Sequence, residues 1–341
     1  MWEEELVGNE TQDEEEITAD EVSEDDFALV QAPVVRPVED PRSQSKYGRM
    51  GTARSDETAR RINSGKKKRA GLRAILIVVC TIALLAGVFS AYTLSYYFGQ
   101  KQYDDLSSSM IKAPTALASA SDEEISALLA DTGVFWGGLL SINSDIVAWV
   151  YVPDAGISFP ICLGQDNDTY LYRSFDGIQG NAIWPSMGTP FVVRDQAGTS
   201  AQEFLHENEG VYIYGRNMRS HAMFARFIEA YSSGKGFSAH SRIFVFTPQG
   251  NYWLKPVSYL KLGQGESFFE TRFDTPMQKA AYLYELISRN MVAKITFERP
   301  GAHEIERFFV FETGLGEAGG ANDIGYMLLC SVEGFVQAPI A

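Results

Sequence analysis

Residues 210–218 read GVYIYGRNM, and the first six letters form one of several short runs rich in β-branched and aromatic residues. Runs of this kind, separated by Gly, Asn, Pro and Ser, are typical of β-strands. The others are DIVAWVYV (145–152), RIFVFT (242–247), NYWLKPVSYL (251–260), AKITFE (293–298), RFFVFET (307–313) and IGYMLLCSV (324–332). So many strands with so few helices predict a closed β-barrel or a β-sandwich.

Two helices are predicted among these strands. Thr275 and Pro276 supply an N-cap and a first helical position for a helix over residues 275–290. Apolar residues recur along it at helical spacing: Met277, Ala281, Tyr284 and Ile287. Ser121, followed by the acidic residues 122–124, is the signature of a second helix start.

The most hydrophobic stretch is AILIVVCTIALLAGVFSAYTLSYYF, from Ala74 to Phe98, with no charged residue. As a helix it would extend roughly 37 Å, enough to cross a hydrocarbon layer of ~30 Å. Three tyrosines gather near its C-terminal end, where aromatic rings favour the membrane interface. A cleaved signal peptide is a poorer interpretation, since about 70 residues precede the stretch. We therefore predict a transmembrane helix over 74–98.

Charge is distributed unevenly along the 341 residues, whose net charge is −15. Residues 1–40 contain 15 acidic and one basic side chain, whereas residues 41–73 contain 11 basic and two acidic ones. Because basic residues flank the cytoplasmic end of a span, residues 1–73 are predicted to be cytoplasmic and 99–341 extracellular, in the cell membrane. The first 73 residues are expected to form a disordered tail, acidic and then basic, either simply solvated or bound to a cytoplasmic partner.

Composition also excludes several function classes. The overall acidity argues against a nucleic-acid-binding protein, which needs a basic face. Three Cys without CxxC or HExxH spacing indicate neither a disulfide scaffold nor a metal site, and no cofactor is expected. The predicted segments are a tail (1–73), a span (74–98), a Ser/Ala-rich stalk (99–120) and an external domain (121–341).

Several phrases of the external domain resemble, in order, the class B sortases, membrane-anchored cysteine transpeptidases of Gram-positive bacteria. INSDIVAW (142–149) is similar to the family's N-x-D-I-V-G-W. ISFP (157–160) and QDNDTYL (165–171) are similar to Y-P-V-x-Q … D-N-x-Y-Y-L. The most specific match is IYGRNM (213–218) with MFA (223–225), close to Y-G-H-N-M … M-F.

This resemblance spans about residues 122–332 and implies a mainly β fold, a sortase-type closed barrel of seven to eight strands with peripheral helices. It also implies a reaction in which a Cys thiolate attacks a sorting signal and an amine resolves the thioester. In this reaction the thiol must be deprotonated and the leaving amine must receive a proton, and a His transfers these protons. The oxygen of the tetrahedral intermediate needs hydrogen-bond donors, and an Arg supplies them. Sorting-signal peptides and cell-wall or surface proteins are the implied partners.

The sequence departs from the family at the His and Arg positions. Arg216 occupies the His position, and arginine stays protonated, so it cannot transfer a proton during turnover. The family's Arg lies in a final strand shortly after the Cys, but no Lys or Arg follows Cys330 and the last arginine is Arg307. Only eleven residues follow Cys330, which is short for a turn and a full closing strand, so one barrel edge is expected to be incomplete or paired differently. His221 is a candidate substitute base, with a solvated histidine as the alternative.

The nucleophile position is ambiguous in register. The family reads Thr-Leu-x-Thr-Cys at the end of the penultimate strand, where we place YMLLCSVE (326–333). Matching Cys to Cys selects Cys330, matching the leucine to Leu328 selects Ser331, and one further step selects Val332. A one-residue slip turns a strand side chain to the opposite face, so Cys330 is either the nucleophile or an inert strand cysteine.

We therefore expect a membrane-anchored sortase-like protein that has lost conventional transpeptidation and keeps a peptide- or partner-binding role. A divergent but active transpeptidase using Cys330 is the alternative from the enzyme class. A structural envelope protein that keeps the barrel without its groove is the third.

Overall fold

The computed structural model of the chain describes residues 52–181, 186–194, 200–201, 203–218, 220–263, 266–314 and 325–338. The chain divides into two compact units, Met1–Ala70 and Gly71–Ala341. Only the beginning of a helix is described in the first unit. The acidic stretch predicted to be disordered, 1–40, lies outside the described residues.

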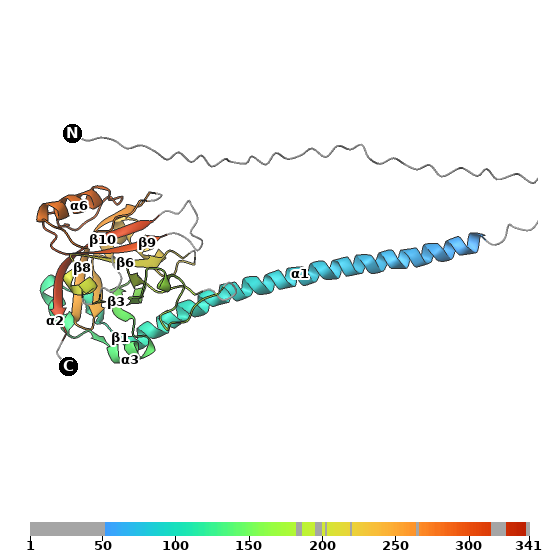
Figure 1. Cartoon of the computed structure of the whole chain (residues 1–341), viewed down its shortest axis with the longest axis horizontal. Helices are drawn as coiled ribbons and strands as arrows, with labels where there is room; N and C mark the ends of the chain where they lie inside the picture. Colours follow the sequence, from blue (N-terminus) through green and yellow to red (C-terminus); the bar gives the residue numbers. More distant parts are fainter. Residues whose placement is uncertain are drawn as a thin grey trace, which may run out of the picture. The chain divides into compact units, whose positions relative to one another are not determined.

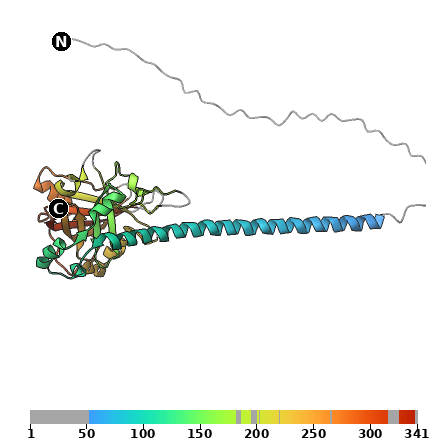
Figure 2. The ribbon, with the colours of Figure 1, turned by 90° about the horizontal axis from the view of Figure 1, so that it is seen from below.

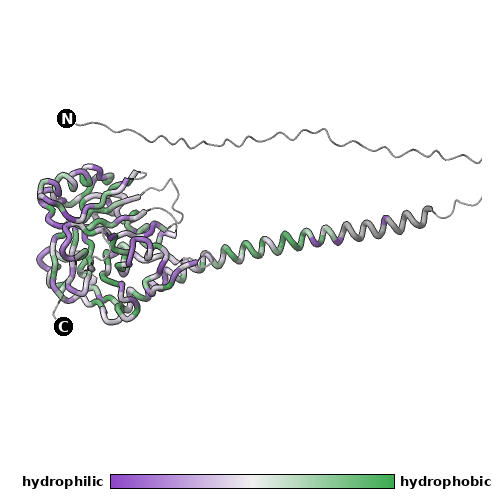
Figure 3. Tube along the Cα trace, in the orientation of Figure 1, coloured by the Kyte–Doolittle hydropathy of each residue, from purple (hydrophilic) through white to green (hydrophobic). Residues whose placement is uncertain are grey.

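Helix α1 (Thr52–Met110) is the first described element and has 59 residues. Its part from Arg69 to Met110 is long and apolar enough to cross a membrane and includes the predicted span, 74–98. The apolar side chains of the predicted span are mostly exposed, and Figure 3 shows the hydrophobic band that they form along the helix. The helix is longer than predicted at both ends, because it begins within the expected tail (1–73) and continues into the expected stalk (99–120).

The segment 99–120 packs against the barrel, which corrects the prediction of a stalk. Tyr103 is only 2% exposed, and its ring centroid lies 5.0 Å from that of Phe175 and 5.9 Å from that of Phe159. Its hydroxyl donates a hydrogen bond of 2.7 Å to the carbonyl of Gly188. The C-terminal end of α1 is thus a part of the folded domain, as Figures 1 and 2 both show.

Short strands and peripheral helices follow α1. The strands are β1 (Ile111–Lys112), β2 (Gly133–Val134), β3 (Ile146–Val152), β4 (Ile157–Cys162), β5 (Phe191–Val192), β6 (Gly210–Arg216), β7 (Ile243–Thr247), β8 (Gly250–Lys261), β9 (Phe308–Gly314) and β10 (Tyr326–Gln337). The helices are η1 (Thr115–Ala118), α2 (Asp122–Ala130), α3 (Trp136–Ile142), η2 (Thr169–Leu171), η3 (Glu203–Glu207), α4 (Ala225–Tyr231), α5 (Gly234–Ala239) and α6 (Pro276–Ser288). Residues 293–298, predicted to be a strand, form none.

Eight strands close into a barrel in the order β10-β8-β7-β3-β4-β5-β6-β9, which confirms the predicted barrel. Strand β9 pairs in parallel with β6 and antiparallel with β10. β10 pairs with β8 from Tyr326 to Gln337, so the closing strand is complete and the expectation of an incomplete edge is wrong. The expectation placed YMLLCSVE in the penultimate strand, whereas it belongs to β10, the last described strand. The strand before it is β9, FFVFETG.

Two apolar clusters hold the barrel and its helices together. The interior is rich in aromatic side chains, among them Trp149, Phe159, Phe227 and Phe311. A second cluster lies on the outer face of the barrel beneath α6 and includes Tyr212, Val310, Leu329, Leu283 and Leu286. Because successive side chains of a strand point to opposite faces, β6, β9 and β10 contribute to both clusters.

Both predicted helix starts are confirmed as capping boxes. Ser121 accepts a hydrogen bond from the Glu124 amide, and Thr275 accepts one from the Gln278 amide, in each case with the reciprocal bond. The predicted apolar face of α6 is wrong, however, because Met277 is 82% exposed. The buried residues of this helix are Leu283 and Leu286.

Candidate functional site

The candidate site lies where the parallel strands β6 and β9 end side by side. Their register places Tyr214 opposite Glu312 and Arg216 opposite Gly314. Glu312 and Gly314 alternate along β9 with the inward-facing Phe311, and Tyr214 and Arg216 are their register partners on β6. All four positions therefore lie on the outer face of the barrel. The two strand ends thus bring an arginine, a glycine, a tyrosine and a glutamate together.

Arg216 acts here as a hydrogen-bond donor to a neighbouring segment. Its Nη1 donates to the carbonyl of Ser186 at 3.0 Å, and its guanidinium lies 5.1 Å from the ring centroid of Tyr172. No carboxylate of the described residues pairs with it. A guanidinium can steady a carbonyl oxygen in this way, but it cannot supply the proton transfer that an imidazole supplies.

Gly314 has no side chain, and the space beside it is filled by a neighbour. A Cβ atom at this position would lie 2.5 Å from Oη of Tyr214 and 3.0 Å from its Cε2. Burial raises the pKa of Tyr214 to about 12, with the nearby Glu312 charge adding to the rise and Arg216 opposing it. The phenol is therefore protonated at neutral pH. It covers the end of β9 without offering a nucleophile.

Glu312 is the titratable group of this site that sequence reasoning missed. Burial raises its pKa to about 7, and it makes no hydrogen bond or ion pair with any described residue. The only sequence signal is a charged residue inside the otherwise apolar run RFFVFET. A carboxyl group with this pKa exchanges its proton near neutral pH.

Cys330, the candidate nucleophile, lies far from Arg216. Its register partner on β9 is Phe309, which pairs in turn with Val211 on β6. Val211 precedes Arg216 by five residues, a separation of roughly 16 Å along the strand. The structure therefore does not bring Cys330 and Arg216 together.

The surroundings of Cys330 are those of an inert core cysteine. The residue is fully buried in the barrel interior. Its Sγ has only a weak contact of 3.9 Å with the carbonyl oxygen of Leu328. Burial raises the pKa of the thiol well above its usual value, so the reactive thiolate is suppressed.

The alternative candidates are not at the strand ends either. Ser331 is 2% exposed and is hydrogen-bonded to the Lys255 carbonyl (3.4 Å) and the Glu333 carboxylate. Val332, the next register choice, is half-buried on the same strand. His221 has a side chain 77% exposed and pairs with Glu229 on the surface. Of the two alternatives given for His221, a substitute base or a solvated histidine, the structure shows the solvated histidine.

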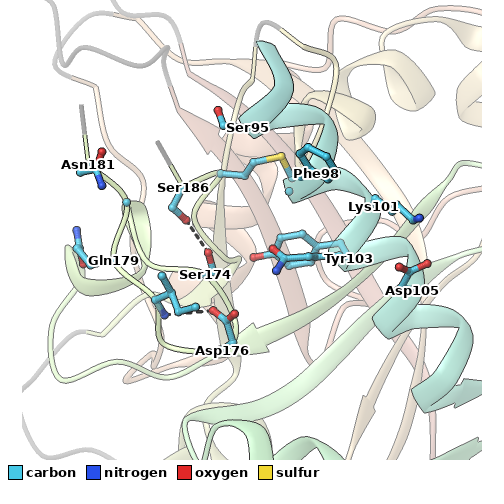
Figure 4. Close-up of a pocket in the computed structure, with 15 residues that line it drawn as sticks. Ser95, Phe98, Lys101, Tyr103, Asp105, Ser174, Asp176, Gln179, Asn181 and Ser186 are labelled. Atoms are coloured by element: carbon cyan, nitrogen blue, oxygen red, sulfur yellow. Dashed lines mark hydrogen bonds between the residues drawn. The ribbon is translucent and has the colours of Figure 1, made fainter. Parts of the chain in front are cut away.

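A cavity of about 500 Å³ adjoins the site between α1 and residues 174–181 and 186–187 (Figure 4). Ser186 lines it, and its Oγ lies 2.9 Å from Oγ of Ser174. The carbonyl of the same Ser186 accepts the hydrogen bond from Arg216. Tyr103 of α1 also lines the cavity, so Arg216 connects the strand ends to the segment on which α1 docks.

The described residues contain no group of three or more His, Cys, Asp or Glu side chains that could hold a metal ion.

Two curated proteins are similar to part of the chain. Sortase B of Listeria monocytogenes is 28% identical over 148 residues, which cover 43% of this chain and 55% of the relative. Sortase B of Staphylococcus aureus is 22% identical over 158 residues, covering 45% and 58% respectively. The chain thus spans little more than half the length of the curated relatives it matches. No protein-family model matches the sequence.

Solved structures share the fold. A sortase B from Bacillus anthracis in complex with AAEK1 superposes with a TM-score of 0.52 at 17% identity, over 71% of this chain and 100% of the other. A Bacillus anthracis protein described as similar to sortase B gives a TM-score of 0.52 at 18% identity, over 70% and 98%. The predicted fold and the resemblance to class B sortases are confirmed.

Proposed function

Given a chain with the class B sortase fold and with sequence likeness to sortases B, we propose that it is a recognition module that binds sorting-signal peptides without transpeptidation. The observation that carries the proposal is the pairing of Arg216 with Gly314 beneath the Tyr214 side chain. At this place the family reaction needs an imidazole and a thiolate.

Gly314 is, in this proposal, the counterpart of the family's cysteine. The family pattern Thr-Leu-x-Thr-Cys ends the penultimate strand, and β9 ends in Val310-Phe-Glu-Thr-Gly314. The second threonine is kept as Thr313, and glycine follows it. This alignment replaces the one that selected Cys330, because it uses the strand that pairs in parallel with β6.

The arginine position is lost in the same alignment. The final strand begins at Tyr326, which pairs with Thr313. The ring of Tyr326 stacks on the ring of Tyr259 at a centroid distance of 5.6 Å. No cationic side chain follows in the described part of β10. A thiolate, a proton carrier and an oxyanion donor are thus all replaced, and loss of any one of them costs most of such a reaction.

Peptide recognition needs less than catalysis. The cavity of about 500 Å³ that adjoins Arg216 through Ser186 offers both apolar and polar side chains, among them Phe98, Met187 and Ser186. Cavities with apolar walls and a few polar groups are typical of ligand sites. The proposed setting is the outer face of the cell membrane, with α1 as a single-span anchor oriented by the basic residues that precede its apolar stretch.

The test uses the full chain in detergent micelles with fluorescent sorting-signal peptides of class B sortases and an amine acceptor. We expect saturable binding by fluorescence anisotropy and no transfer product by mass spectrometry. Turnover that disappears in Cys330→Ala would establish the divergent transpeptidase instead. Absence of both binding and turnover would favour a purely structural barrel.

A further inference from the structure

A second cavity, of about 540 Å³, lies at the end of the barrel opposite the Arg216–Gly314 pair. It is lined by side chains near the starts of β8 and β9 and the end of β10, among them Arg307, His206, Tyr252 and Phe335. Gly210 pairs with Phe308 at this end, six residues before the Arg216–Gly314 pair. The two ends are therefore roughly 20 Å apart along the strands.

Arg307 is held in this cavity by three neutral oxygens. Its Nε donates to the Asn208 carbonyl (2.7 Å), its Nη2 to the Leu205 carbonyl (2.8 Å) and its Nη1 to the Tyr252 hydroxyl (2.9 Å). Its guanidinium also lies 5.3 Å from the Tyr252 ring centroid. These contacts fix the orientation of the guanidinium plane before any ligand arrives.

The fixed guanidinium has no counter-ion among the described residues. A guanidinium has five N–H donors, so the three bonds leave one N–H on each terminal nitrogen. By contrast, Arg289 donates twice to the Glu266 carboxylate at 2.6 Å. The Leu205 carbonyl and the Tyr252 hydroxyl lie 2.9 Å apart and occupy the paired edge of the guanidinium, so the two free N–H groups point to opposite sides. A half-buried cation without an anion is costly, and a carboxylate bonded to one of these N–H groups would supply the missing charge.

The other polar groups of the cavity favour a ligand with a single negative charge. His206 is hydrogen-bonded to the Tyr252 hydroxyl (2.7 Å) and Gln249 (3.2 Å), and burial, followed by the Arg307 charge, lowers its pKa. The imidazole is therefore neutral at pH 7, which leaves Arg307 as the one cation. Glu306 at the exposed rim repels a second negative charge.

An apolar surface stands beside the guanidinium. Phe335 is 43% exposed, and its ring centroid lies 4.5 Å from that of Tyr252 and 5.8 Å from that of His206. A large aromatic side chain left open beside a cationic group can receive the apolar body of a ligand.

From this arrangement we propose that the cavity binds a small organic monocarboxylate with an apolar body, such as the C-terminal residue of a short peptide. The carboxylate bonds to a free N–H group of Arg307, and the apolar body rests on Phe335. This site is separate from the strand ends at Arg216 and does not depend on the proposed function.

The experiment measures binding of N-acetylphenylalanine to the full chain in detergent micelles by isothermal titration calorimetry. The neutral N-acetylphenylalanine amide and inorganic phosphate serve as comparison probes. We expect the carboxylate to bind at least about tenfold more tightly than either, because only it combines a single negative charge for Arg307 with an apolar body for Phe335. Equal binding of the amide, or no binding of the carboxylate at millimolar concentration, would overturn the proposal.

Two variants test the site by different routes. Arg307→Lys keeps the charge and removes the planar guanidinium that the three oxygens hold in place, and we expect it to weaken carboxylate binding about tenfold. Phe335→Glu changes an exposed side chain, so the fold is kept, and it places a competing carboxylate beside Arg307 with the same expected loss. Arg242→Lys, whose arginine pairs with Asp122 elsewhere, is the matched control and should bind normally. Undiminished binding in Phe335→Glu would contradict the site.

Discussion

Arg216 and Gly314 are register partners at the ends of the parallel strands β6 and β9, and the Tyr214 hydroxyl fills the place where a Cβ of residue 314 would stand. The arginine holds the Ser186 carbonyl, and the tyrosine closes the end of β9. These contacts stabilise the strand ends at which the proposed function places the lost catalytic groups, and they have measurable consequences.

Adding a methyl group at residue 314 should destabilise the domain. We expect Gly314→Ala to lower the free energy of unfolding by about 1–3 kcal/mol, because the new Cβ overlaps Tyr214. Tyr214→Phe removes the nearest atom, so the double variant should lose less than the sum of the single ones. Thermal unfolding followed by near-ultraviolet circular dichroism measures this coupling. Gly133→Ala, where the Cβ meets nothing within 4 Å, is the control. Equal effects at both glycines would contradict the packing described.

Removing the Arg216 side chain should loosen the segment on which α1 docks. Arg216→Ala loses the hydrogen bond to Ser186 and the contact with Tyr172, each worth about 1 kcal/mol. We expect amide hydrogen exchange in residues 186–189 to become about tenfold faster or more, and exchange in β3 to be unchanged. If both regions respond alike, Arg216 supports the whole barrel rather than this segment.

The two domain cysteines should be unreactive in the native protein. Cys162 and Cys330 are both fully buried, and burial raises the pKa of each thiol. In a Cys80→Ala background, iodoacetamide should therefore label neither of them before unfolding and both after it. Rapid native labelling that is lost in Cys330→Ala would show an accessible, ionised thiol.

Stability should fall as the pH rises through neutrality because of Glu312. Its pKa is raised from 4.5 to about 7, so the folded state binds its proton more tightly than the unfolded state does. This stabilisation is complete below about pH 4.5, declines between the two pKa values and is absent above pH 7. The shift corresponds to a change on the order of 3 kcal/mol.

Glu312→Gln tests this directly, because the amide keeps the shape of the side chain and does not titrate. We expect the variant to be more stable than the parent at pH 8 and to show a flatter stability profile between pH 5 and pH 8. Glu285→Gln, an exposed carboxyl change on α6, is the matched control and should leave the profile unchanged. An unchanged profile in Glu312→Gln would mean that the carboxyl group is ionised and solvated in the fold.

Much of the fold could be predicted because local signals agreed with it. These signals can be read from residues close together in the sequence. They are the IYGRNM phrase, the strand composition and the two capping boxes of Ser121 and Thr275. The burial of Tyr103 could not be predicted, since it depends on Phe159 and Phe175, which are distant in the sequence. For the same reason the buried face of α6 was assigned to Met277 rather than to Leu283.

The site was harder to predict because its decisive residue is a glycine. RFFVFET and IGYMLLCSV have similar composition, and the cysteine in the second favoured it as the penultimate strand. Only the pairing of β9 with β6 reveals that Gly314, not Cys330, stands beside Arg216. Glu312 likewise becomes notable only once its burial is known.

The loss of an attacking thiol is tested most directly by the intact mass of the full chain after incubation with sorting-signal peptides in the absence of an acceptor amine. We predict that the mass stays that of the free chain while the same peptides bind reversibly. A mass increase equal to the acyl part of the peptide, released by hydroxylamine and absent in Cys330→Ala, would contradict it and make the chain a transpeptidase.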